Sequence, residues 1–320
     1  MTQERIFMPD PLPVRRLLEF DDLNVRACGP PEGLNRNILR PELNRPALEL
    51  TGFFEKYQPD RVQIFGSGEM AYLESHRRDE AVLKNLERIF SLLPPCVVVT
   101  NDLELFPEIL QYAERHKVAI LRSTHNTTIF TKRLWDALEL ELSPYVVRRG
   151  VLMDVFNVGV LITGPSSIGK SECALELLSK GHAFVADDLI YIRGTQFSKL
   201  VGTGRSPVPY HMEVRGIGII DVSRMYGPKS VRMTKQVDLV IQLEEWDSGK
   251  EYERLGIEDK ITTILGIEKS CYTIPIKPGR NIATIVEVAV LDYKLKSAGV
   301  HMAKEFDEKL IRSMKKHEDL

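Results

Sequence analysis

Several features that define other protein classes are missing from this 320-residue sequence. No apolar run is long enough to span a bilayer, and the first residues lack the apolar core of a signal peptide. There are only four cysteines, and no C-x-x-C pair, which argues against a disulfide framework and a zinc site. We therefore expect a cytoplasmic protein with reduced thiols and no membrane partner.

An excess of positive charge is missing as well. The 43 lysines and arginines are balanced by 45 aspartates and glutamates, so the formal net charge is -2. Such a chain has no overall positive field that would attract nucleic acid. Hydrophobic residues make up 43% and charged residues 28%, the balance of a globular protein whose length suits two domains.

The first half of the chain alternates β-rich runs with amphipathic helical patterns, which predicts an α/β domain. We expect strands at 61–66, 96–100 and 117–123, with helices at 79–93 and 106–116. The stretch "ELSPYVVRRG" (141–150) contains Pro144 and few packing signals, so we place a domain boundary there. Residues 1–143 then form an N-terminal α/β domain, and 144–320 form a C-terminal domain.

The β-rich pattern restarts after this boundary. "VLMDVFNVGVLITG" predicts two strands with a turn at 156–159, and the chain is expected to end in an amphipathic helix at roughly 295–314. The stretch 194–210 is rich in glycine, proline and serine, which suggests a mobile loop over a site. Further strands are predicted at 182–192, 238–246 and 281–293.

A phosphate-binding loop is the strongest local signal. "GPSSIGKS" fits G-x-x-x-x-G-K-[ST] at Gly164, Gly169, Lys170 and Ser171, between an apolar strand and a helix that Gly181 can cap. In such a loop, backbone N–H groups surround a phosphate, the lysine reaches the outer phosphates and the serine can ligate magnesium. The sequence therefore predicts a nucleoside triphosphate site; the loop is completed by Pro165, Ser166, Ser167 and Ile168.

A second glycine motif, "GSGEMA" (66–71), matches G-x-G-x-x-A after a predicted strand. A dinucleotide site would also need an acidic residue at the end of a second strand at the right distance, and none is present. We interpret this motif as an ordinary turn.

Acidic residues follow the loop at positions that suit a phosphate-transfer site. "AFVADD" places Asp187 and Asp188 at the expected end of a strand, where one carboxylate can serve magnesium and the other accept a hydroxyl proton. Which of the two accepts the proton stays open, and a turn or helix cap is the alternative. Glu213, beside a Gly-Ile-Gly turn, is a second candidate metal ligand, although a solvated turn explains it equally well.

Together the phosphate loop, "HAFVADD", "EVRGIGIIDV", "YERLG" and "PIKPGRN" resemble the HPr kinase/phosphorylase family, in the same order and at similar spacing. The first half resembles that family's N-terminal domain through "NRPALELTGFFEKY", "RVQIFGSGEMAYL" and "PPCVVVTND". The resemblance implies a C-terminal P-loop core similar to phosphoenolpyruvate carboxykinase, a homohexamer, and HPr, the phosphocarrier of the sugar phosphotransferase system, as partner. Members phosphorylate a serine of HPr with ATP and remove that phosphate with inorganic phosphate, releasing pyrophosphate.

The resemblance also implies roles for individual residues. Arg254 matches a catalytic arginine, and Lys277 and Arg280 lie in a segment associated with dephosphorylation. The family pattern has a catalytic histidine before "GVL", where this sequence has Arg149. Arginine cannot shuttle a proton near neutral pH, and we expect it to depress the pKa of the nearby aspartates.

Two alternatives to the bifunctional enzyme follow. Arg149 raises the alternative of a nucleotide-sensing regulator with weak or no catalysis. A small-molecule kinase on a carboxykinase-like core is the other, but the distinctive "EVRGIGIIDV" weighs against it.

Overall fold

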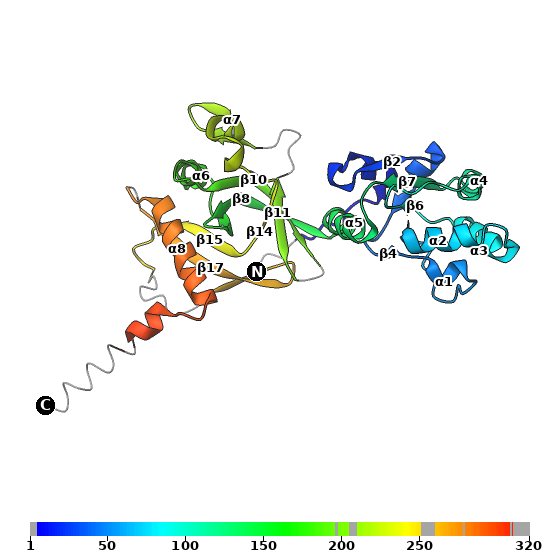
Figure 1. The fold of residues 1–320 in the computed structure, drawn as a ribbon. Coiled ribbons are helices and arrows are strands. Elements are labelled where there is room, and N and C mark those ends of the chain that lie inside the picture. The colour runs from blue at the N-terminus through cyan, green and yellow to red at the C-terminus, as the bar shows by residue number, and fades with distance from the viewer. Residues whose placement is uncertain are drawn as a thin grey trace. The chain divides into compact units, whose positions relative to one another are not determined.

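The chain folds into two compact units (Figure 1). The computed structural model describes residues 5–195, 198–204, 210–250, 260–277, 279–307 and 309. One unit is Met8–Ser143; the other begins at Pro144 and also includes the segment that ends at Phe7. Phe7 joins it through two backbone hydrogen bonds with Tyr145, of 2.8 and 2.9 Å. None of the described helices is long and apolar enough to cross a membrane.

A five-stranded sheet forms the centre of the N-terminal unit, in the order β2-β7-β6-β5-β4. Strands β4 to β7 run parallel, and β2 pairs antiparallel with β7. Two further short strands pair with each other. The strands are β1 (Leu12–Pro13), β2 (Val25–Ala27), β3 (Asn37–Ile38), β4 (Leu43–Asn44), β5 (Val62–Phe65), β6 (Cys96–Val99) and β7 (Ala119–Ser123).

Helices cover both faces of this sheet. Strands β5 and β6 are buried at every position because apolar side chains pack on both of their faces, as is usual in parallel sheets. Helices α2, α3 and α4 contribute to the core on one face, and α5 to the core on the other. The predicted strands and helices of this unit are confirmed, with ends within two residues; the helices are α1 (Ala47–Leu50), α2 (Ser67–Ser75), α3 (Glu80–Ser91), α4 (Pro107–His116) and α5 (Thr127–Leu142).

The glycine motif of the N-terminal unit is a strand-to-helix turn. Gly66 precedes α2, and its N–H donates to the Glu69 carboxylate at 2.9 Å. Glu69 is buried and also accepts hydrogen bonds from the Arg45 guanidinium. The N–H group at the start of this helix is therefore already satisfied by a carboxylate of the protein itself, as in an ordinary turn.

The C-terminal unit is built on an eight-stranded mixed sheet, in the order β14-β11-β10-β8-β9-β15-β17-β16. The β9-β15 and β15-β17 pairs are parallel and the other pairs are antiparallel. A separate hairpin pairs β12 with β13. The strands are β8 (Tyr145–Val155), β9 (Val158–Thr163), β10 (Ala183–Gly194), β11 (Leu200–Gly204), β12 (His211–Val214), β13 (Gly218–Asp221), β14 (Thr234–Gln236), β15 (Leu239–Glu245), β16 (Ile261–Ile264) and β17 (Ile267–Ile276).

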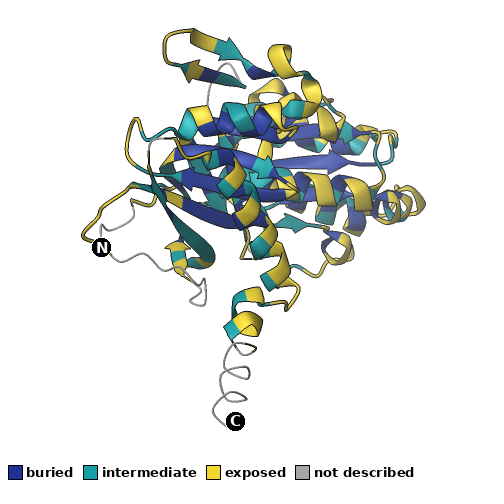
Figure 2. Cartoon of the chain, turned by 90° about the vertical axis from the view of Figure 1, so that its left-hand side faces the viewer, coloured by how far each residue is buried: buried dark blue, intermediate teal, exposed yellow. Residues whose placement is uncertain are grey.

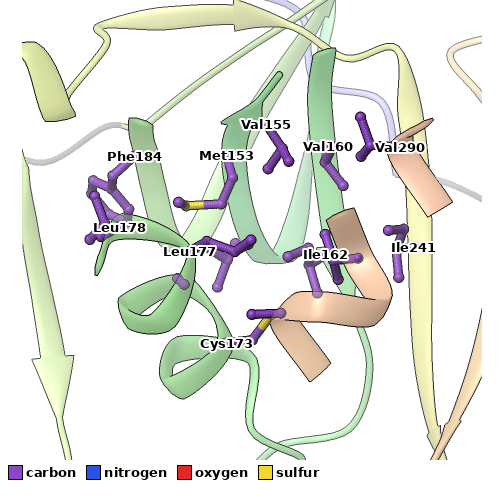
Figure 3. Close-up of a cluster of buried hydrophobic side chains, with 14 of the residues drawn as sticks. Met153, Val155, Val160, Ile162, Cys173, Leu177, Leu178, Phe184, Ile241 and Val290 are labelled. Atoms are coloured by element: carbon purple, nitrogen blue, oxygen red, sulfur yellow. The ribbon is translucent and has the colours of Figure 1, made fainter. Parts of the chain in front are cut away.

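Two helices, α6 (Lys170–Ser179) and α8 (Ile282–Ser297), cover one face of this sheet; a third, α7 (Val222–Tyr226), follows β13. Figure 2 shows strands in dark blue as buried, while helices expose their outer sides. In Figure 3, Leu177 and Cys173 of α6 and Val290 of α8 point toward strand residues such as Met153 and Ile162. This shared core fixes the helix that begins at the predicted phosphate loop.

Several sequence predictions for this unit were wrong. Residues 281–293 are not a strand: Asn281 caps α8, and the buried Ala283, Val286 and Val290 recur at helical spacing despite the β-branched composition. The helix predicted at 295–314 is confirmed in part: its start is the last turn of α8, residues 298–301 interrupt it, and 302–307 are helical again. Residues 308 and 310–314 lie outside the described residues.

The predicted boundary stretch and the predicted mobile loop also contain strands. β8 starts at Tyr145 inside the supposed boundary stretch, with Val146 buried, and β11 lies within the predicted loop 194–210. Residues 196–197 and 205–209 of that loop lie outside the described residues. The turn predicted at 156–159 is confirmed, because Phe156 and Asn157 adopt the left-handed conformation of a tight hairpin.

A polar clamp joins α8 to the end of α6. Glu287 of α8 pairs with Lys180 and accepts a 3.0 Å hydrogen bond from the buried His182. Thr284, one helical turn earlier, also accepts a hydrogen bond from Lys180. Although burial acts to raise it, hydrogen bonds from Lys180 and His182 lower the pKa of Glu287 overall. The ionised carboxylate therefore stabilises the fold above its unfolded-state pKa, and that contribution is lost as the pH falls through the folded-state pKa.

We expect Glu287→Gln to lower the free energy of unfolding at pH 7 by about 1–3 kcal/mol, since charge-assisted hydrogen bonds at a partly buried site are lost. Urea denaturation measures the effect. The exposed Glu268, replaced by glutamine, is the matched control and should change little. A loss that persists unchanged at pH 3 would contradict an electrostatic origin.

Candidate active site

The predicted strand, loop and helix are present at residues 158–179. β9 ends at Thr163, the loop turns through Gly164 and Gly169, and α6 begins at Lys170. Gly164 has φ +148°, and a Cβ there would lie 2.6 Å from the Leu243 carbonyl oxygen; Gly169 has φ +101°. Glycine suits these positions best, and both residues line the pocket described below. Loops of this kind bind anions through their backbone N–H groups.

Lys170 lies folded over this loop. Its Nζ donates hydrogen bonds to the carbonyl oxygens of Gly164, at 3.1 Å, and Pro165, at 2.6 Å. The ammonium group is thus held at the loop, where it can exchange two carbonyl acceptors for phosphate oxygens. The N-terminus of α6 adds positive potential at the same place.

The sequence predicted that the two aspartates lie at the end of a strand. That prediction was wrong. β10 continues beyond them to Gly194, and Asp187 and Asp188 pair with Val151 and Gly150 of β8. Asp188 has φ +67°, a left-handed conformation that asparagine and aspartate tolerate best, so the strand is locally distorted there. Such strain within a strand commonly marks a functional position.

Asp187 is the better supported of the two carboxylates. Its Oδ2 accepts a 3.0 Å hydrogen bond from the Ser171 hydroxyl, and its Oδ1 accepts one of 2.9 Å from the Asp188 N–H. These bonds connect the strand that carries the acid to the first turn of α6. The carboxylate is therefore held beside the phosphate loop.

The pKa of Asp187 is raised, which contradicts our expectation that Arg149 would depress it. Burial raises the pKa by more than the hydrogen bonds from Asp188 and Ser171, and the charge of Lys170, lower it. A desolvated carboxylate binds protons more strongly than an exposed one. The carboxylate of Asp187 is therefore a stronger base than an ordinary aspartate, which suits a general base working near neutral pH.

The β12–β13 hairpin supplies the opposite wall. Its Arg215 donates from Nη2 to the Ser167 hydroxyl at 2.8 Å, which ties the hairpin turn to the phosphate loop. Glu213 lies two residues before Arg215, on β12, and is exposed in the same pocket. The sequence signal for Arg215 is its place in the same motif as Glu213, "EVRGIGIIDV".

A pocket of about 260 Å³ gathers most of the predicted residues. Lining residues that the sequence reasoning left out are Gly150, Glu172, Leu175, Val214 and Arg215. The predicted residues that line it are Arg149, Gly164, Ser166, Ser167, Gly169, Lys170, Ser171, Asp187, Asp188 and Glu213.

The predicted cations near the C-terminal end are placed elsewhere or are not described. Lys277 lies over the Trp246 ring, with Nζ 3.6 Å from its centroid, and Arg280 donates to the Pro275 carbonyl at 2.9 Å. Neither is among the described residues that line the pocket. Arg254 lies outside the described residues.

The pocket's oxygen donors fit a magnesium ion that arrives with a nucleotide. No cluster of three or more histidine, cysteine, aspartate or glutamate side chains that could hold an ion occurs in the described parts of the chain. Magnesium usually needs only one or two protein carboxylates, with substrate phosphates completing its shell. Ser171 and Glu213 line the same pocket, so these two residues would hold the ion.

Comparison with known proteins identifies the family. The model for the HPr Serine kinase N terminus matches residues 12–138, and that for the HPr Serine kinase C-terminal domain matches residues 140–310. An HPr kinase/phosphorylase of Caldicellulosiruptor bescii is 44% identical over 298 residues, covering 92% of this chain and 94% of that protein. The chain belongs to the HPr kinase/phosphorylase family.

A second curated relative is similar over most of the chain. This HPr kinase/phosphorylase, from Geobacillus sp., is 42% identical over 279 residues, covering 87% of this chain and 89% of that protein. A solved structure, the Hpr(Ser) kinase/phosphatase from Coxiella burnetii, is 32% identical and covers 48% of this chain and 93% of its own, with a TM-score of 0.45. The family assignment therefore extends over nearly the whole sequence.

Proposed function

We propose that this chain is a bifunctional enzyme, which phosphorylates a serine of HPr with ATP and removes that phosphate with inorganic phosphate. The family supports the kinase and its protein substrate. The observation that carries the chemistry is Asp187, a buried carboxylate in contact with Ser171 at the phosphate loop. The carboxykinase-like core and the hexamer remain predictions of the resemblance.

In the forward direction, the loop and Lys170 hold the phosphates of ATP, and Asp187 takes the proton of the seryl hydroxyl. The seryl oxygen forms a bond to the γ-phosphorus, the bond between that phosphorus and the β-phosphate oxygen breaks, and ADP leaves. Magnesium, held by Ser171 and Glu213, would supply positive charge to the phosphate oxygens, while Asp187 stays available for the proton. Positioning and electrostatic stabilisation are the main contributions a protein makes to such a transfer.

The reverse branch uses the same groups. An oxygen of inorganic phosphate forms a bond to the phosphorus of phosphoserine, the serine–phosphorus bond breaks, and Asp187 returns its proton to the seryl oxygen. The products are pyrophosphate and the free hydroxyl. One carboxylate can serve both directions because proton transfer is microscopically reversible.

Arg149 keeps the nucleotide-sensing regulator as a second candidate. Its side chain is exposed, lines the pocket, and has no hydrogen-bond or ion-pair partner among the residues that the structure describes. A permanent cation there attracts phosphate groups but cannot exchange a proton. If the histidine of the family pattern is needed for turnover, this chain binds ATP and turns over little.

The deciding experiment measures phosphoserine on purified HPr with MgATP, then its loss after inorganic phosphate is added. We expect the wild type to do both, because Asp187 and Lys170 line the same pocket. ATP binding without phosphoserine, together with its recovery in Arg149→His, would instead establish the regulator.

Arg149→His should make the KM for phosphate depend on pH. Histidine, with an ordinary pKa of about 6.5, is charged at pH 6 and neutral at pH 8, whereas arginine stays charged. Relative to wild type at the same pH, we expect the KM of Arg149→His to be similar at pH 6 and several times higher at pH 8. Arg149→Lys keeps the charge and should follow wild type at both pH values.

A further inference from the structure

The outer face of the β12–β13 hairpin exposes apolar side chains that the proposed chemistry does not use. Ile217 at the turn and Ile219 on β13 are 77% and 74% exposed. Figures 1 and 2 both place this hairpin at the top of the C-terminal unit, and Figure 2 colours most of it as exposed. We call Ile217 and Ile219 the hairpin tip.

The hairpin is anchored so that its two faces differ. Met212 is 1% exposed in the core, and Val214 and Ile220 pack against the same core. Side chains alternate along a strand, so the remaining positions of the hairpin point outward. The exposure of Ile219 is therefore set by the register and does not reflect a loosely packed segment.

The register also places the hairpin tip beside the pocket. Ile219 is paired with Glu213 across the hairpin, and directly opposed residues of an antiparallel pair share one face. Glu213, Val214 and Arg215 line the pocket. The apolar surface is thus continuous with the wall of the site where the hydroxyl must react.

We propose that the hairpin tip is a docking surface for the protein substrate, and that it contacts apolar side chains next to the reactive serine. This inference rests on the proposed function. A seryl hydroxyl that reaches Asp187 brings the surface of its protein against the pocket rim, and the hairpin forms part of that rim. A second copy held permanently on Ile219 would cover the face that also carries Glu213, and would obstruct the pocket.

The test is the double variant Ile217→Ser/Ile219→Ser, assayed with HPr and MgATP. Removing two large apolar side chains from a contact should raise the KM for HPr by about tenfold or more. The kcat, the KM for ATP and the melting temperature should stay near wild type, because neither residue touches the phosphate loop or the core. Fluorescence anisotropy of labelled HPr should show the same loss in affinity.

The matched control is Ile261→Ser, since Ile261 is 60% exposed on β16, at the end of the sheet remote from β10. The hairpin packs near β10 and α6. Ile219→Thr, which keeps a β-branched side chain, checks that any effect does not come from a damaged hairpin and should raise the KM for HPr by a smaller factor.

Three results would overturn the docking surface: an unchanged KM for HPr, an equal rise in the KM for ATP, or dissociation of an oligomer by light scattering. The last would show that the hairpin tip contacts a second copy. Absence of phosphoserine in the wild type would refute the proposed function itself, and this outcome is distinct because it appears without any substitution.

Discussion

Asp187→Asn is expected to abolish phosphate transfer in both directions while making the protein more stable. A general base or acid typically contributes about 10²- to 10⁴-fold to a rate, and asparagine can neither take nor return a proton. Its amide can still accept from the Asp188 N–H and donate to the Ser171 hydroxyl, so the local geometry is retained. The loss should appear in kcat with little change in ATP binding.

The predicted gain in stability follows from the direction of the pKa shift. Because burial raises the pKa of Asp187, the folded state holds a proton more readily than the unfolded state. The free energy of unfolding therefore falls as the pH rises from the unfolded-state value of about 3.9 through the folded-state pKa, and it stays lowered at pH 7. Asparagine has no charge to desolvate, so its melting temperature should be higher at pH 7 and equal to wild type at pH 3.

Asp188→Asn is the matched control. Asp188 is exposed, its left-handed backbone suits asparagine, and it binds Asp187 through its N–H, which the substitution keeps. We expect a loss of about tenfold or less in kcat and no gain in melting temperature, since a neighbouring exposed charge adds little. Equal losses in the two variants would refute the assignment of the proton to Asp187.

The sequence predicted the features that neighbouring residues determine, and it failed where distant segments pair. The phosphate loop is local: one strand, two glycines and one helix start specify it, and the structure has them at the predicted residues. The place of Asp187 is not local, because β10 extends past it by pairing with β8 on one side and β11 on the other. Arg149 likewise reaches the pocket through the register of β8 with β10, which residue spacing does not reveal.

The strand prediction at 281–293 was wrong because it followed amino-acid composition and ignored the helical spacing of the apolar residues. Isoleucine and valine are frequent in 281–293 and favour a strand, but the buried positions of α8 follow a helical repeat, and packing on the sheet decided the outcome. The direction of the pKa shift of Asp187 could not be predicted from the sequence either. A nearby cation can be read from a sequence, whereas burial, which dominates here, depends on the complete fold.

Lys170→Ala should remove both nucleotide binding and turnover. The ammonium group now bonds two loop carbonyls, which it can exchange for the outer phosphates. Losing one such contact to a transferring phosphoryl group commonly costs about 10²- to 10³-fold in rate. Wild type at 100 times its Kd for MgATP gains about 2.7 kcal/mol in stability, and the variant should gain almost none at the same concentration.

Lys229→Ala tests whether removal of any lysine from this unit has such an effect, because Lys229 is exposed and is not among the residues that line the pocket. It should keep full turnover and the full thermal shift with MgATP. Without nucleotide, the free energy of unfolding of Lys170→Ala should lie within about 1 kcal/mol of wild type, since water can replace the lysine at the exposed Pro165 carbonyl. A Lys170→Ala protein that still binds MgATP tightly would mean that this loop does not hold the phosphates, and the proposed chemistry would have no site in this pocket.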